Sequence, residues 1–370
     1  MRIVVTGAEG FIASNLLVKL GELGHTNVVG IGRDTSHADR HQALTSTDFV
    51  FHLAGVNRPR ETAEFVSGNV GSTEMLCAAL AAAGRRATVV FTSSTQATLD
   101  NAYGQSKRAA EETLLRHARE TGSTVHVFRL VNVFGKWCRP DYNSVVATFC
   151  HNLARGLPIR VDDPAAPLRL VYVEDVVAAF TALLAGPQAG NGYAEAGPVY
   201  ETTVGELAQT LRAFGTSRST LLTDRVGVGM IRALYATYIS YLPPTYFGYE
   251  VPRYEDSRGL FVEMLKTPDC GQFSYFSARP GVTRGEHYHH SKTEKFLVVR
   301  GTARFGFRQI RTGETHELIA RGGEASIVET VPGWAHNITN IGDDDLIVML
   351  WANEIFDRSQ PDTQPMKVKP

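Results

Sequence analysis

The chain has 370 residues, of which 43% are hydrophobic and 20% charged, a composition typical of a folded globular protein large enough for two domains. Its formal net charge of -1 gives no overall field that would attract nucleic acid or an anionic membrane surface, so we expect neither as a partner. The four cysteines are scattered without a Cys-x-x-Cys pair, which argues against a disulfide framework and suits a reducing compartment.

The N-terminus leads directly into an apolar run and a glycine turn, so we expect no signal peptide. The most apolar stretch, residues 230–242, contains Arg232 and is too short to span a bilayer. A cytoplasmic location is therefore expected.

Short apolar runs alternate with helical patterns in the first half of the chain. The runs are Ile3–Val5, Val28–Ile31, Phe49–Leu53, Thr88–Phe91 and Val125–Leu130. Amphipathic segments lie between them at 11–23, 73–83 and 106–119. Apolar runs without polar alternation, separated by helices, predict a doubly wound parallel α/β sheet of the Rossmann type. The second and third runs are close in sequence, so the usual connection between them must be abbreviated.

Residues 6–13 form a glycine-rich turn between the first expected strand and the first expected helix. Gly7 permits the tight turn, Gly10 lets the backbone approach a pyrophosphate, and the small Ala13 lets the helix pack on the sheet. Phe11 and Ile12 open that helix, whose free N–H groups favour negative charge. This position between strand and helix predicts a dinucleotide site.

Arg33 follows the second expected strand. An NAD-dependent enzyme usually carries an acidic residue there for the ribose hydroxyls, whereas an arginine suits the 2′-phosphate of NADP. The alternative is a merely solvated arginine. We expect NADPH as the cofactor.

The spacing of this turn resembles that of the extended short-chain dehydrogenase/reductase family, and further segments resemble the family in the same order. These segments are His52–Gly55, Ser93–Thr95, the Tyr-x-x-x-Lys of Tyr103–Lys107, and Arg129–Gly135. The resemblance implies that Leu53 and Ala54 line the cofactor and that Asn132 contacts the substrate.

The same resemblance implies that Tyr103 donates a proton to a ketone oxygen, that Lys107 holds the nicotinamide ribose, and that Ser94 orients the carbonyl. We expect the pKa of Tyr103 to fall under the charges of Lys107 and the nicotinamide. Ser94 and Tyr103 are closer in sequence than in most of the family, so Ser93 and Thr95 stay alternatives to Ser94. Arg169 lies one position from the family's substrate arginine and is a candidate phosphate contact.

The helical pattern stops at a double proline near residue 243, and short strands with glycine turns follow. We expect a reductase domain over residues 1–243, a linker over 244–252 and an all-β jelly roll over 253–370. The tail from residue 360 is expected to be frayed.

A histidine cluster lies within this second domain. Residues 281–301 read Gly-x5-His-x-His-x4-Glu-x6-Gly and residues 332–340 read Pro-Gly-x2-His-x3-Asn, which resemble the two cupin motifs. Strand alternation places His287 and His289 on one face, with Glu294 and His336 arriving from neighbouring strands. Three imidazoles and a carboxylate suit a divalent metal, of which zinc is favoured over iron or manganese. The alternative is a set of surface histidines.

Residues 254–263 and 284–287 resemble the Arg-Gly-x-Phe-x-Glu and Arg-Gly-x-His segments of cupin-fold epimerases that act on 4-keto-6-deoxy nucleotide sugars. That resemblance makes His287 the base, in competition with a role as metal ligand. Arg258 and Arg284 would steady an enolate or the diphosphate.

The order of the two domains resembles bifunctional enzymes of capsular polysaccharide synthesis that make the precursor of UDP-N-acetyl-L-fucosamine. The resemblance implies C-3 epimerisation of a UDP-linked 4-keto-6-deoxy sugar in the cupin and reduction of its C-4 ketone in the Rossmann domain. A homodimer is expected from fold analogy. The alternatives are a reductase whose cupin only binds metal or sugar or mediates dimerisation, a non-enzymatic nucleotide sensor, and a metal-dependent cupin dioxygenase.

Overall fold

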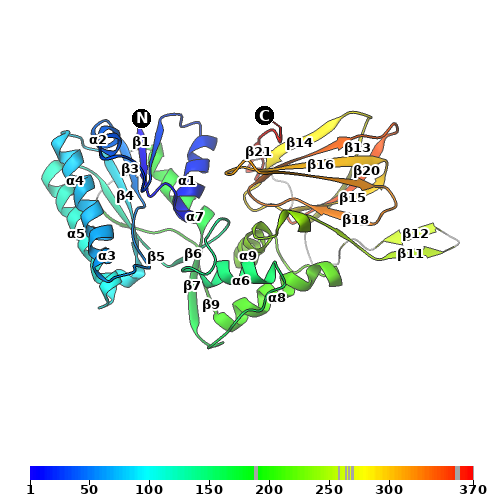
Figure 1. Ribbon diagram of the computed structural model, residues 1–370, viewed down its shortest axis with the longest axis horizontal. Helices are drawn as coiled ribbons and strands as arrows, with labels where there is room; N and C mark the ends of the chain where they lie inside the picture. The colour runs from blue at the N-terminus through cyan, green and yellow to red at the C-terminus, as the bar shows by residue number, and fades with distance from the viewer. Residues whose placement is uncertain are drawn as a thin grey trace. The chain divides into compact units, whose positions relative to one another are not determined.

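The computed structural model describes residues 1–186, 191–256, 259–262, 265, 267, 271–354 and 359–369. The chain divides into two compact units (Figure 1). The N-terminal unit comprises residues 1–144 and 168–201, and the C-terminal unit comprises residues 145–167 and 202–370.

A six-stranded parallel sheet forms the centre of the N-terminal unit, in the order β2-β1-β3-β4-β5-β8. Its strands are β1 (Ile3–Thr6), β2 (Val28–Ile31), β3 (Phe49–His52), β4 (Thr88–Ser94), β5 (Val125–Leu130) and β8 (Gly192–Ala194). A small sheet contains β6 (Asn132–Phe134), β7 (Pro167–Tyr172) and β9 (Val199–Thr203). The expected doubly wound parallel sheet is confirmed.

Helices cover both faces of the large sheet (Figure 1). The helices are α1 (Phe11–Glu22), α2 (His37–Thr45), α3 (Ala63–Phe65) with the π-helix η1 (Val66–Gly71), α4 (Ser72–Ala82), α5 (Ala102–Thr121) and α7 (Val173–Ala182), with 3-10 turns η2 (Thr95–Thr98) and η3 (Leu183–Ala185). Helices α1 and α7 pack together on one face, and α2, α4 and α5 pack on the other, where Leu44, Leu80 and Leu114 share a core with the strands. Between β2 and β3 lies the single helix α2, which is the abbreviated connection that the sequence predicts.

Two antiparallel five-stranded sheets form a sandwich in the C-terminal unit, in the orders β10-β18-β15-β20-β13 and β17-β16-β19-β14-β21. The strands are β10 (Gly248–Glu250), β13 (Gln272–Ala278), β14 (Thr283–Tyr288), β15 (Glu294–Arg300), β16 (Thr302–Gln309), β17 (Thr315–Arg321), β18 (Ser326–Glu329), β19 (Trp334–Asn340), β20 (Leu346–Ala352) and β21 (Gln364–Pro365). A separate hairpin pairs β11 (Arg253–Asp256) with β12 (Gly259–Val262). Phe296 of one sheet contacts Phe305 of the other, with ring centroids 5.6 Å apart, so aromatic side chains fill the space between the sheets.

Three helices that precede residue 243 belong to the C-terminal unit, which differs from the expected domain boundary at that residue. They are α6 (Val145–Leu153), α8 (Val204–Thr220) and α9 (Gly229–Ser240). Arg218 of α8 pairs with Glu329 of β18, and Arg232 of α9 pairs with Ser291 of the sandwich. These contacts explain why the helical segment groups with the β-sandwich.

The expected linker over 244–252 instead contains the 3-10 turn η4 (Pro244–Tyr246) and strand β10, which pairs with β18. Phe247 is fully buried there, with its ring centroid 4.9 Å from that of Trp334 and 5.3 Å from that of Phe307. The double proline correctly predicted the end of the helix. The buried Phe247 that follows it makes this segment part of the sandwich.

The expectation of a frayed tail is wrong for residues 359–369. Strand β21 pairs with β14 through His287 and Tyr288. None of the helices in the described part of the chain combines the length and apolar character that a bilayer-spanning segment requires.

Candidate functional sites

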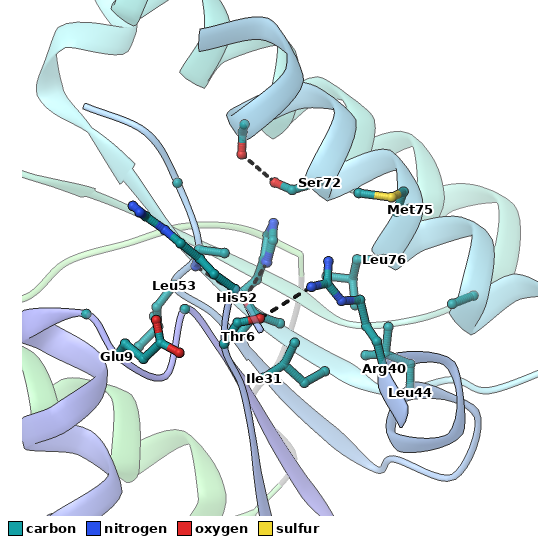
Figure 2. Close-up of a pocket in the computed structure, with 18 of the residues that line it drawn as sticks. Thr6, Glu9, Ile31, Arg40, Leu44, His52, Leu53, Ser72, Met75 and Leu76 are labelled. Carbon is teal, nitrogen blue, oxygen red and sulfur yellow. Dashed lines mark hydrogen bonds between the residues drawn. The ribbon is translucent and has the colours of Figure 1, made fainter. Parts of the chain in front are cut away.

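A cavity of about 770 Å³ opens at the carboxyl ends of β1, β2 and β3, the position where open α/β sheets bind their ligands. Figure 2 shows Arg40 and Leu44 of α2 below Met75 and Leu76 of α4, with His52 at the end of β3 to the left of these side chains. The cavity is large enough for an extended nucleotide.

The glycine turn forms the floor of this cavity. Gly7 has a φ of 68°, and a Cβ there would lie 2.8 Å from the Cα of Ala54, so a side chain at position 7 would collide with the backbone after β3. Gly10 precedes α1 without any side-chain cap, and Phe11 and Ile12 form its first turn. The first N–H groups of α1 therefore face the cavity region unblocked, which fits the pyrophosphate of a dinucleotide.

His52 fixes the far wall of the cavity. Its Nδ1 lies 2.8 Å from the hydroxyl of Thr6, its Nε2 lies 3.0 Å from the hydroxyl of Thr73, and the Thr6 hydroxyl also accepts from the backbone N–H of Ala54 at 3.2 Å. Burial, reinforced by the charge of Lys107, lowers the pKa of His52 to about 3. A neutral imidazole therefore bridges two strands and α4, and holds Leu53 and Ala54, which line the cavity, in place.

Basic side chains gather where β2 ends. Arg33 is exposed at the cavity edge, and His37, Arg40 and His41 of α2 line it as well. The Arg40 guanidinium donates to the carbonyl of Gly32 at 3.3 Å, which holds it over the loop. Of these four residues, only Arg33 was predicted from the sequence. The signal for the other three was the run of basic residues in the short helix after β2.

Tyr103 and Lys107 lie one helical turn apart in the first turns of α5. The side chain of Asn101 caps this helix by accepting from the N–H of Gly104 at 2.8 Å, which fixes the start of the helix just before Tyr103. The Lys107 ammonium donates to the carbonyl of Thr92 at 3.0 Å. A Cβ placed on Gly55, which lines the cavity, would lie 3.0 Å from that ammonium, so Lys107 adjoins the cofactor cavity.

The protonation states of this pair follow from their burial. Burial lowers the pKa of Lys107 to about 8, against the raising effect of Glu111. Burial raises the pKa of Tyr103, and a hydrogen bond with Ser94 partly opposes it. This direction is opposite to the fall expected from the sequence. It keeps the phenol protonated at neutral pH, the form that a proton donor requires.

The structure separates Ser93 from Ser94. The Ser93 hydroxyl donates to the buried carboxylate of Glu111, which Arg129 also clamps with N–O distances of 3.0 and 2.6 Å. Ser93 and Arg129 therefore belong to a network that ties β4 and β5 to α5. Ser94 hydrogen-bonds Tyr103, so Ser94 is the hydroxyl that lies beside the phenol.

The two expected substrate contacts of this unit lie on the small sheet. Asn132 is exposed at the start of β6. Arg169 on β7 is exposed as well, with its Nε 3.5 Å from the carboxylate of Glu201. Neither is among the described residues that line the 770 Å³ cavity.

The four expected metal ligands come together in the C-terminal unit. One nitrogen or oxygen from each of His287, His289, Glu294 and His336 lies within 4.8 Å of the others. Glu294 Oε2 is 3.2 Å from His289 Nε2 and 3.4 Å from His336 Nε2. A bulge in β14 between Gly285 and His287 sets His287 opposite His336 in the strand pairing. This donor set fits a divalent cation such as zinc.

The charges in the cluster suit a cation. Burial, followed by the neighbouring His336 and His289, lowers the pKa of His287 to about 3. Burial also lowers the pKa of His336. Burial alone would raise the pKa of Glu294, but His289, His336 and Lys292 hold it well below its usual value. His287 and His336 as neutral imidazoles and Glu294 as an ionised carboxylate are in the forms that bind metals.

A second cavity, of about 190 Å³, adjoins the cluster and is lined by His287, Glu294 and His336. Four aromatic rings also line it, those of Phe276, Phe296, Phe305 and Phe307. The guanidinium of Arg284 lies 5.0 Å from the centre of the Phe276 ring at the edge of this cavity. Arg258 lies outside the described residues.

Comparison with known proteins places the chain in a family. Residues 3–196 match the NAD dependent epimerase/dehydratase family, to which the chain belongs, and residues 254–364 match the polysaccharide biosynthesis C-terminal domain. The chain is 53% identical, over 368 residues, to a UDP-2-acetamido-2,6-beta-L-arabino-hexul-4-ose reductase of Pseudomonas aeruginosa, with 100% of this chain and 99% of the relative covered.

Solved structures agree with this assignment. The capsular polysaccharide assembling protein CapF from Staphylococcus aureus is 41% identical with a TM-score of 0.69, and the match covers 99% of this chain and 100% of that one. UDP-glucose 4-epimerase of Thermotoga maritima is 26% identical with a TM-score of 0.52, over 58% of this chain and 82% of that one. The resemblance to capsular polysaccharide proteins that the sequence predicts is confirmed.

Proposed function

We propose that the protein is a bifunctional UDP-sugar enzyme that epimerises C-3 of UDP-2-acetamido-2,6-dideoxy-4-hexulose and then reduces the C-4 ketone. The product is UDP-N-acetyl-6-deoxy-L-talosamine, a precursor of UDP-N-acetyl-L-fucosamine for capsular polysaccharide. The observation that carries the reductase activity is the hydrogen-bonded Ser94–Tyr103 pair with Lys107 beside the dinucleotide cavity. The 53% identity to a hexul-4-ose reductase supports the substrate class.

When bound in the cavity of the reductase unit, NADPH would supply a hydride for the C-4 carbon. Tyr103, protonated at neutral pH, gives its proton to the ketone oxygen, so that hydride and proton together convert the ketone to an alcohol. Ser94 orients that oxygen, and Lys107 holds the nicotinamide ribose. Arg33 and Arg40 provide positive charge for the 2′-phosphate, which supports NADPH as the cofactor. Asn132 and Arg169 would contact the sugar nucleotide.

In the cupin unit the metal would be held by His287, His289, Glu294 and His336, and would supply positive charge close to the substrate ketone. The Phe-lined cavity beside these residues excludes water from a deoxysugar, and Arg284 at its edge, with Arg258, would bind the diphosphate or steady an enolate. Epimerisation must precede reduction, because the C-3 proton is acidic only while the adjacent ketone can take up charge.

Two roles remain for His287, since a nitrogen that binds a metal cannot at the same time take the C-3 proton. A His287→Gln variant separates them. If His287 is the base, the variant keeps a metal content near that of the parent protein but loses exchange at C-3. If His287 is a metal ligand, the variant loses exchange and its metal content also falls. Metal content by atomic emission and exchange by NMR are measured on the same sample.

The test of the proposed function is an incubation with the 4-keto sugar nucleotide in deuterated water, with and without NADPH, followed by NMR and by absorbance. Deuterium at C-3 without NADPH, and oxidation of NADPH when it is added, support both activities. NADPH oxidation without deuterium at C-3 would instead favour a reductase whose cupin only binds metal or sugar or mediates a homodimer. If neither deuterium at C-3 nor oxidation of NADPH is observed, the proposed substrate class is wrong.

A further inference from the structure

The carboxylate of Asp362 caps the turn that separates the ligands His289 and Glu294. Its Oδ1 accepts from the backbone N–H of His290 at 2.8 Å. Its Oδ2 accepts from the N–H groups of Ser291 and Lys292, both at 2.7 Å, and from the Ser291 hydroxyl at 3.0 Å. One half-buried side chain from the C-terminal segment therefore fixes the backbone between two of the four cluster residues, about seventy positions earlier in the chain.

The backbone carbonyl of Asp362 acts on His289 directly, because it accepts a hydrogen bond from His289 Nδ1. A carbonyl can only accept, so Nδ1 of His289 carries a proton. This leaves Nε2 as the His289 nitrogen that faces the cluster, 3.2 Å from Glu294. A hydrogen bond at the outer nitrogen is the device that orients metal-binding histidines and makes them better ligands.

A second set of contacts acts on His287. Glu286 has a φ of 61°, an unfavourable backbone conformation for a residue with a side chain, at the bulge that turns His287 toward the cluster. Its carboxylate accepts from the N–H of Val368 at 2.7 Å and from the Asn337 amide at 2.9 Å. Its carbonyl accepts from the N–H of Met366 at 2.8 Å. The C-terminal segment thus supports the bulge on both its backbone and its side chain.

We infer that residues 359–369 position the metal ligands His287 and His289, with Asp362 as the chief positioning residue. This inference rests on the metal site of the proposed function. The sandwich strands bring the four ligands near one another, but two of them point correctly only when the C-terminal segment is bound across β14. None of the described residues of this segment lines the 190 Å³ cavity or belongs to the four-residue cluster. The segment acts through the histidines.

The test compares Asp362→Ala and Asp362→Asn with the parent protein and with Asp343→Asn, a control at an exposed aspartate of the β19–β20 loop. Zinc affinity is measured by competition with a chromophoric chelator, and ligand geometry from the visible absorption of the cobalt(II)-substituted protein. We expect Asp362→Ala to bind zinc about 10- to 100-fold more weakly, with an altered cobalt spectrum. Asp362→Asn keeps one acceptor oxygen and should show a smaller change in the same direction. The control should match the parent.

A parent protein that binds no zinc would refute the proposed metal site itself. If the parent and the Asp362 variants bind zinc with equal affinity and give the same cobalt spectrum, only the positioning role is overturned. Lower thermal stability of the variants with unchanged metal binding would also overturn it, because the segment would then be merely structural. Should Asp362→Ala fail to fold, the cobalt spectrum and zinc affinity of Asp362→Asn decide the question.

Discussion

At the scale of single residues, burial rather than a neighbouring charge sets the state of the groups beside the cofactor cavity. The Tyr103 phenol is largely buried and shares a hydrogen bond with Ser94, and its pKa is raised as a result of that burial. Lys107 is buried as well, with its ammonium on a backbone carbonyl, and its pKa is lowered. Both shifts favour the neutral form of the group concerned. The Tyr103 phenol therefore stays protonated near neutral pH, whereas the Lys107 ammonium loses its proton just above that pH.

Replacing Tyr103 by phenylalanine removes the proton donor and leaves the shape of the site. We expect ketone reduction to slow by about 10² to 10⁴-fold, the usual contribution of a positioned general acid, with NADPH binding unchanged. Single-turnover oxidation of NADPH measures the first, and quenching of protein fluorescence measures the second. Tyr246→Phe, at an exposed tyrosine, serves as the control. A rate within a few-fold of the parent would remove Tyr103 from the mechanism.

The pH dependence of reduction should report Lys107. Its pKa is lowered to about 8, so the ammonium is present below that pH and is lost as pH rises through it. We expect kcat/KM for the ketone to fall above pH 8, by about tenfold per pH unit, since this parameter reports groups of the free enzyme. In Lys107→Met the rate is lower and this alkaline limb is absent. Persistence of the limb in that variant would assign it to another group.

At the scale of elements, a buried ionic cluster docks α8 onto the β-sandwich. Glu329 of β18 pairs with Arg218 of α8 and with Lys295 of β15, and all three side chains are largely buried. Burial would raise the pKa of Glu329, but the two cations hold it below its usual value. The Glu329 carboxylate is thus the shared partner of two largely desolvated cations.

Removing that carboxylate strands two buried charges. We expect Glu329→Ala to lower the free energy of unfolding of the C-terminal unit by about 3 to 5 kcal/mol, as when one member of a buried ion pair is deleted. Urea denaturation provides the measurement. Glu324→Ala breaks an exposed pair with Arg321 and should cost less than about 1 kcal/mol. If the two substitutions lowered the free energy of unfolding equally, the buried cluster would not contribute more to the attachment of α8 than an exposed ion pair does.

Elements with local signals were predictable from the sequence, and elements defined by distant partners were not. The apolar runs of β1 to β5 and the glycine turn before α1 stand in the structure where the residues predicted them. Strand β10 was missed because Phe247 is one apolar residue after two prolines, and only Phe307 and Trp334 show why it is buried.

The same distinction holds at the sites. His287, His289, Glu294 and His336 follow from spacing, because strand alternation and the motif ends place them together. Asp362 lies in a polar tail that has no periodicity, and its partners are backbone N–H groups about seventy residues away. Every residue except proline has a backbone N–H, so the sequence around Asp362 contains no pattern that would identify its hydrogen-bond partners.

At the scale of the whole molecule, the described residues of each site come from one unit. The glycine turn, Ser94, Tyr103 and Lys107 belong to the N-terminal unit, and the histidine cluster with its aromatic cavity belongs to the C-terminal unit. The proposed reaction requires only that the C-4 ketone is still present while C-3 is inverted. Nothing in either set of described residues requires the other set for its own geometry, so each half of the reaction should tolerate loss of the other.

Two complementary variants test this independence. Tyr103→Phe disables reduction and leaves the histidine cluster, while Glu294→Gln weakens the cluster and leaves the dinucleotide site. We expect each variant alone to form little of the doubly converted sugar, and an equimolar mixture to form it at a rate that rises with protein concentration. Tyr103→Phe alone should still introduce deuterium at C-3, because in the proposed order of steps epimerisation precedes reduction of the ketone.

Product formation by the mixture, followed by NMR, would mean that the epimerised ketone leaves one chain and is reduced on another. A mixture no more active than the sum of its parts, with deuterium exchange intact in Tyr103→Phe, would contradict free diffusion and require direct transfer of the ketone within one chain. Loss of exchange in Tyr103→Phe would contradict the independence of the sites, since a phenol in the N-terminal unit would then govern proton removal at the histidine cluster.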